Sequence, residues 1–162
     1  MPDLRQQIQC CSREKVCLMG LGNAAAGDDG FGVRLAEELA RAGLHDVIVA
    51  GTEPERSVGR AAESGYDHLV FLDAVDFGGE PGAAVWLDAP AMAARFPQVS
   101  THRISLGLLA RWAESSGKTR AWLLGVQPHS LQPAERLTPA VETTTRILRE
   151  WLLQAFAGRI AA

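Results

Sequence analysis

Two adjacent aspartates interrupt a glycine-rich stretch near the start of the chain. The sequence GLGNAAAGDDGFG occupies residues 20–32 and carries Asp28 and Asp29 between two glycines. It follows an apolar run and precedes a helical pattern. Acidic side chains at a helix start cap the helix and complement its dipole, which explains one aspartate better than two. We therefore interpret Asp28 as a capping residue and Asp29 as a candidate residue of a chemical site.

The same stretch resembles a phosphate-binding turn. Gly20, Gly22 and Ala25 match the dinucleotide pattern G-x-G-x-x-A, which brings backbone N–H groups to a pyrophosphate. Two carboxylates at the helix start would repel that pyrophosphate. The acid that usually holds the ribose is also missing, because the second apolar run ends in Val49 and Ala50. We assign no cofactor-binding residues and keep a dinucleotide-binding oxidoreductase only as an alternative.

Two further residues could do chemistry with Asp29. Asp73 ends the apolar run LVFLD, where a carboxylate is costly unless it is paired, bound to a cation or capping the next turn. His102 begins a helical pattern, a position at which a lone histidine is more often a surface or capping residue than a ligand. Two carboxylates and an imidazole suit a transition-metal ion. Their spacing along the chain is not specific, so the residues alone indicate no more than a candidate metal site.

The elements that must position these residues alternate along the chain. Several continuous apolar runs, each only a few residues long, suit strands that are covered on both faces. The loop AVDFGGEPG is too short for a helical crossover, so the third and fourth strands are expected to pair antiparallel. The predicted strands are 16–20, 46–50, 68–73, 83–88 and 121–126, and the predicted helices are 29–42, 104–116 and 138–158.

This pattern predicts an α/β fold: a three-layer α/β/α single domain. Its sheet is expected to be twisted, five-stranded and mostly parallel, with helices on both faces and one antiparallel strand pair. In such sheets, ligands bind beyond the carboxyl ends of the strands. Asp29, Asp73 and His102 all fall at predicted strand ends or helix starts, and we expect them on one rim.

The composition limits the classes of partner. The chain has 162 residues, enough for one domain, and its net charge of −3 argues against nucleic acid or anionic membrane as the main partner. Residues 1–14 are polar and are expected to form a loose extension ahead of a domain at 15–158. They lack the apolar core of a signal peptide, so we expect a cytoplasmic protein. Cys10, Cys11 and Cys17 are expected to be ordinary reduced thiols.

Five motifs in register resemble a known family. Together they are similar to the endopeptidases that mature nickel–iron hydrogenases, over about residues 16–155. Three of them, GTEPE, STH and LLGVQP, are most similar to the branch that acts on hydrogenase-3-type enzymes. The motifs are GLGNAAAGDDGFGVRLAEEL, GTEPE at 51–55, FLDAVDFGGEPG at 71–82, STHRISL at 100–106 and LLGVQP at 123–128.

The resemblance implies an activity and a site. It implies an aspartyl-type endopeptidase that removes a short C-terminal peptide from the hydrogenase large-subunit precursor after nickel insertion. Asp29, Asp73 and His102 fall on the family's nickel ligands, and the nickel is supplied by the precursor. Hydrolysis would use a metal-polarised carbonyl, or a water activated by metal or carboxylate. We expect a monomer whose partner is that precursor.

One departure and one alternative accompany the resemblance. Many relatives have an acid or glycine just before the G-T motif of the second strand, where this chain has Val49 and Ala50. We therefore carry over no role for the position before the G-T motif. The departure does not affect the three proposed ligands. The alternative is a non-catalytic chaperone that checks the precursor for nickel without cutting it.

Overall fold

Five strands form one sheet in the order β2-β1-β3-β5-β4. The computed structural model describes residues 3–97 and 104–160. Each strand overlaps a predicted one to within one residue at either end, because a strand buried on both faces leaves a continuous apolar run. Only β4 runs antiparallel to its neighbour. The strands are β1 Val16–Leu21, β2 Val47–Gly51, β3 His68–Ala74, β4 Ala84–Asp88 and β5 Arg120–Val126.

The antiparallel pair exists, but the expected pairing of β3 with β4 is wrong. β5 lies between them, and β4 pairs with β5 instead. The connecting loop crosses the end of β5 by hydrogen bonding to Gln127: the side-chain Oε1 accepts from the N–H groups of Phe77 and Gly79 at 2.9 and 3.1 Å. The backbone carbonyl of Gln127 accepts from the N–H of Gly82 at 2.9 Å. A residue about 50 positions away therefore holds this loop in place.

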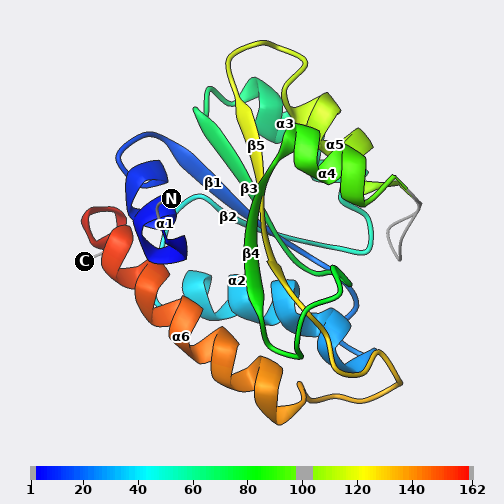
Figure 1. The fold of residues 1–162 in the computed structure, drawn as a ribbon. Helices are drawn as coiled ribbons and strands as arrows, with labels where there is room; N and C mark the ends of the chain where they lie inside the picture. The colour runs from blue at the N-terminus through cyan, green and yellow to red at the C-terminus, as the bar shows by residue number, and fades with distance from the viewer. Residues whose placement is uncertain (1–2, 98–103, 161–162) are drawn as a thin grey trace.

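Helices cover both faces of the sheet, which confirms the three-layer architecture (Figure 1). α1, α2 and α6 pack on one face, and α3, α4 and α5 pack on the other. No helix in the described part of the chain is long and apolar enough to cross a membrane. The helices are α1 Leu4–Cys11, α2 Phe31–Arg41, α3 Glu55–Glu63, α4 Ala89–Arg95, α5 Leu106–Ala113 and α6 Pro139–Ala155, with short 3-10 turns η1 Gly27–Gly30 and η2 Ala157–Arg159.

Side chains of the central strands alternate between two hydrophobic cores. On β3, Val70 and Leu72 point into the core beneath α2 and α6, while Leu69 and Phe71 point into the core beneath α3 and α5. All four are buried. This period of two is the strand's own geometry, and it decides which face each later residue of β3 joins.

The N-terminal residues differ from the loose extension expected of them. Residues 4–11 form α1, whose start is fixed by a capping box: the Asp3 carboxylate accepts from the Gln6 N–H, and the Gln6 side chain accepts from the Asp3 N–H. Ile8 and Cys11 are buried in the core shared with α6. α1 is therefore part of the folded domain.

Candidate functional site

A tight turn joins β1 to α2 and carries the two adjacent aspartates. β1 ends at Leu21, and η1 follows at Gly27–Gly30. Gly22 adopts φ +115°, and a Cβ on it would lie 2.0 Å from the carbonyl oxygen of Asp29. Only glycine allows this approach, because the position combines a positive φ with no room for a side chain. The glycine therefore serves the turn that returns Asp29 to the end of β1.

Asp29 is almost fully buried at this turn, with 3% of the residue exposed. Its Oδ2 accepts a hydrogen bond from the backbone N–H of Asn23 at 2.9 Å. Between residues 3 and 97, and between 104 and 160, no other donor reaches this carboxylate. Burying a carboxylate that accepts one hydrogen bond costs free energy unless a cation or a further hydrogen-bond donor also binds it. Asp29 therefore has the acceptor capacity of a cation ligand.

Asp28 has a different task, and the expectation that it caps its own helix is wrong. The residue is 0% exposed. Its Oδ1 accepts from the N–H of Thr138 at 2.7 Å, and its Oδ2 accepts from the Thr138 hydroxyl and from the N–H groups of His129 and Ser130. Burial raises the pKa of Asp28, but these hydrogen bonds outweigh it and hold the pKa below its ordinary value. Asp28 fixes the loop between β5 and α6.

Asp73 is the penultimate residue of β3 and is 1% exposed. The alternation along the strand puts it on the same face as Phe71, beneath α3 and α5. The start of α2 lies against this strand end, since a Cβ on Gly32 would come within 1.9 Å of the carbonyl oxygen of Leu72. β1 and β3 are parallel neighbours. Asp29 and Asp73 therefore lie at the same rim of the sheet.

The third predicted site residue, His102, lies outside the described residues. α5 begins a few positions later, with the Ser105 side chain accepting from the N–H of Leu108 at its start. α5 packs on the face that Asp73 joins. In the described ranges, no three His, Cys, Asp or Glu side chains are grouped closely enough to hold a metal ion. The set of Asp29, Asp73 and His102 stays a prediction.

Sequence reasoning missed one acidic residue at the same end of the sheet. Glu55 begins α3 directly after the segment that follows β2, and β2 is the neighbour of β1. Its Oε2 is buried and has no hydrogen-bond partner within residues 3–97 and 104–160. An unsatisfied buried carboxylate oxygen is rare and calls for an explanation. The signal was available in the acid that closes GTEPE, but acidic residues are common in the first turn of helices.

The chain matches a family model described as HycI, hydrogenase maturation protease, over residues 33–155. The match includes Asp73 and begins four residues after Asp29. Among curated proteins, the hydrogenase 3 maturation protease of Escherichia coli strain K12 is 33% identical over 141 residues, which cover 83% of this chain and 88% of that protein. The hydrogenase expression/formation protein HupD of Rhizobium leguminosarum is 30% identical, covering 85% and 75%.

Solved structures give the same picture. The chain is similar to the [NiFe] hydrogenase maturation protease HycI from Thermococcus kodakarensis, with a TM-score of 0.77 and 30% identity over 89% of this chain and 93% of that one. It is also similar to the hydrogenase maturating endopeptidase HybD from Escherichia coli, with a TM-score of 0.73 and 28% identity over the same shares. Sequence and fold thus agree on one group of relatives.

Proposed function

The chain belongs to the hydrogenase maturation protease family, and from this premise we propose which peptide it cuts and when. Members of this family are peptidases that act in hydrogenase maturation. The proposed reaction removes a C-terminal peptide from the precursor of a nickel–iron hydrogenase large subunit after nickel insertion. The nickel belongs to the precursor and is the feature that the protease recognises. The observation that carries the proposal is the pair of buried aspartates, Asp29 and Asp73, at one rim of the sheet.

The donor set fits a transition-metal ion carried by a substrate. Carboxylates and imidazole are ordinary ligands of such ions. The Asn23 N–H holds one oxygen of Asp29 and so orients the carboxylate, as outer groups do around metal ligands. Both aspartates are nearly inaccessible to water, which strengthens their attraction for a cation. His102 is proposed as the third ligand because it stands four positions before the start of α5 in the sequence, and α5 packs on the face that Asp73 joins.

In this proposal the chain's own residues act mainly by positioning. Bound nickel fixes the precursor so that its scissile peptide lies at the rim, and fixing the reactants supplies much of the rate enhancement. A carboxylate of Asp29 or Asp73 accepts the proton of the attacking water as the water oxygen bonds to the carbonyl carbon. The carbon–nitrogen bond then breaks, and the proton passes to the leaving amine. The nickel, when bound, polarises the peptide carbonyl.

The decisive experiment follows the mass of the precursor. Purified protein is incubated with nickel-loaded and nickel-free precursor, and C-terminal mass loss is measured over time. We expect cleavage only of the nickel-loaded form, with a loss of at least about a hundredfold in rate for Asp29→Asn and His102→Ala. Glu80→Gln is the control, because Glu80 is exposed in the loop after β3. Normal rates in both site variants would refute the assignment.

The alternatives give different results in the same assay. A nickel-checking chaperone would bind the nickel-loaded precursor and leave its mass unchanged. A dinucleotide-binding protein would bind NAD, which we do not expect because Asp28 and Asp29 are both buried where the pyrophosphate would lie. Cleavage of nickel-free precursor at the normal rate would support the peptidase activity and refute the role of nickel in substrate recognition.

A further inference from the structure

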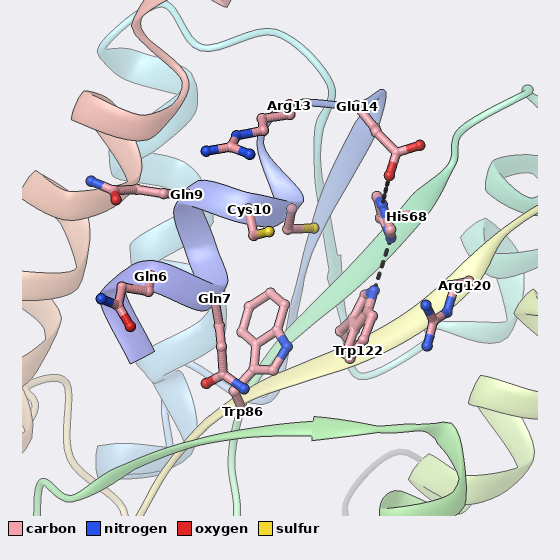
Figure 2. A pocket seen from close by; sticks show the side chains of 11 residues that line it. Gln6, Gln7, Gln9, Cys10, Arg13, Glu14, His68, Trp86, Arg120 and Trp122 are labelled. Atoms are coloured by element: carbon pink, nitrogen blue, oxygen red, sulfur yellow. Dashed lines mark hydrogen bonds and ion pairs between the residues drawn. The ribbon is translucent and has the colours of Figure 1, made fainter. Parts of the chain in front are cut away.

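A pocket lies at the opposite end of the sheet from Asp29 and Asp73. It opens between α1 and the starts of β3 and β5, with a volume of about 500 Å³ (Figure 2). This size falls within the range of small-molecule sites. Asp73 and His68 mark the two ends of β3, so the pocket is separate from the proposed peptidase site. The residues that matter most for its chemistry are Gln7, Cys10, His68, Trp86, Arg120 and Trp122.

Two stacked indoles form one wall of the pocket. The ring centroids of Trp86 and Trp122 are 5.5 Å apart, with 29° between the ring planes. The Arg120 guanidinium lies over the Trp122 ring, 4.8 Å from its centroid. Both tryptophans are only half-buried. Partly open aromatic surface of this kind stacks well against another planar ring.

A hydrogen-bonded chain fixes this wall. The indole N–H of Trp122 donates to Nδ1 of His68 at 2.9 Å, and Nε2 of His68 lies 2.9 Å from the Glu14 carboxylate. An indole can only donate, so Nδ1 is the acceptor and Nε2 carries the proton that is shared with Glu14. A wall held in place before binding loses little conformational entropy when a ligand arrives.

The polar groups around the indoles select for an acidic ligand. Arg13 and Arg120 place two guanidinium groups on the pocket, while its carboxylate, Glu14, is already engaged by His68. Guanidinium groups bind carboxylates and phosphates in a bidentate manner. Side-chain amides from α1, including Gln7, add donors and acceptors that suit the edge of a heteroaromatic ring.

We propose that this pocket binds a planar aromatic ligand that carries an acidic group, either a nucleotide or an aromatic acid. The ring stacks on the Trp86–Trp122 wall, and the acidic group pairs with Arg120 and Arg13. Part of the pocket comes from α1 and Glu14, which lie outside the residues that match the family model. The proposal is therefore independent of the peptidase activity and can fail while that activity stands.

Equilibrium binding to the intact protein tests the proposal. AMP and indole-3-acetate are the probes, and adenosine and indole are their uncharged counterparts. We expect saturable binding of at least one acidic probe, and binding about tenfold weaker for its uncharged counterpart, because a charge-assisted hydrogen bond is lost. AMP alone would identify the nucleotide source, and indole-3-acetate alone the aromatic-acid source. Saturable binding of neither acidic probe at millimolar concentration would overturn the proposal.

Two arginine variants separate the pocket from the rest of the surface. Arg120→Gln should weaken the acidic probe about tenfold. Arg5→Gln is the matched control: Arg5 lies over the Trp151 ring, 5.8 Å from its centroid, and does not line the pocket. We expect Arg5→Gln to leave the affinity unchanged. Equal effects of the two variants, or no effect of Arg120→Gln, would contradict the assignment.

Cys10 gives an independent measure of occupancy. It is exposed and lines the pocket, whereas burial raises the pKa of both Cys11 and Cys17 to about 12 and suppresses their reaction. Iodoacetamide should therefore label Cys10 alone in the folded protein. A saturating acidic probe should slow this labelling severalfold. An unchanged labelling rate at a saturating concentration of bound probe would place the ligand elsewhere.

Discussion

Asp28 and Asp29 are neighbours in the chain, but their carboxylates have different partners. Asp28 accepts hydrogen bonds from three residues of the loop that leads into α6. Among the residues that the structure describes, Asp29 accepts one, from Asn23, and it keeps acceptor capacity for a ligand. Both residues belong to the 3-10 turn η1, so one short turn serves two sets of partners. One aspartate stabilises the frame, and the other is available for chemistry.

The carboxylate of Asp28 makes the stability of the fold depend on pH. Its pKa is below the ordinary value in the fold, so the stabilisation is present above about pH 4 and is lost as the pH falls through that lower pKa. Asp28→Asn should lower the free energy of unfolding by about 2–3 kcal/mol at pH 7. The deficit relative to the natural protein should shrink in acid.

Urea unfolding at a series of pH values measures this deficit. Glu80→Gln is the control, because Glu80 is exposed in the loop after β3 and should change stability by no more than about 0.5 kcal/mol. A deficit for Asp28→Asn that is the same at pH 7 and in acid would show that the carboxylate charge contributes nothing.

At the scale of elements, the position of α2 depends on a close approach to the sheet. A Cβ on Gly32 would lie 1.9 Å from the carbonyl oxygen of Leu72 and 2.5 Å from that of Leu21. These atoms belong to the backbone of two central strands and cannot move aside cheaply. The missing side chain lets the start of α2, and with it η1, settle against the ends of β1 and β3.

Gly32→Ala tests this packing. Alanine favours a helix over glycine by about 1 kcal/mol, yet the clash with two strands should outweigh this and destabilise the fold by about 2–3 kcal/mol. Thermal and urea unfolding give the difference. Gly158→Ala is the control, since nothing lies within 4 Å of a Cβ there, and it should be nearly neutral. Equal stability of the two variants would mean that α2 shifts without cost.

Local sequence patterns predicted all of the strands but missed three of the helices, α1, α3 and α4. All five strands were predictable, because burial on both faces leaves an apolar run that is visible locally. α3 and α4 are short and follow strands closely, so they give few helical periods to recognise. α1 did carry a signal: Asp3 and Gln6 form a capping box ahead of apolar Ile8 and Cys11. Its polar composition concealed that spacing.

Pairings over long distances were not predictable from local patterns. The loop that leads to β4 is bonded to Gln127, and the carboxylate of Asp28 is bonded to Thr138. Both partners are far away in the sequence. The shared rim of Asp29 and Asp73 was predictable, since parallel strands end at the same edge of a sheet. General rules of topology therefore placed Asp29 and Asp73 on one rim, but they could not predict individual side-chain contacts.

At the scale of the whole molecule, α1 is part of the hydrophobic core that α2 and α6 form on one face of the sheet. Ile8 is 1% exposed and packs in the same cluster as residues of α2 and α6. Ile8→Ala should lower the free energy of unfolding by about 2–4 kcal/mol. Because one core is shared, the unfolding should remain a single transition, with circular dichroism and tryptophan fluorescence giving the same midpoint.

Ile147→Ala provides the comparison for Ile8→Ala. Ile147 is 43% exposed on α6, so the same change there should cost little. A separate early transition in Ile8→Ala would instead mean that α1 unfolds on its own.

The hydrogen bonds of Asp28 also set the order in which the molecule can be completed. They reach 101 to 110 positions along the chain, and Ala134 exchanges backbone hydrogen bonds with Ala25 and Gly27 nearby. During synthesis from the N-terminus, both aspartates leave the ribosome long before these partners exist. A nascent chain thus holds the residues of the proposed site without the loop that frames them. The rim reaches its final form only when the start of α6 has emerged.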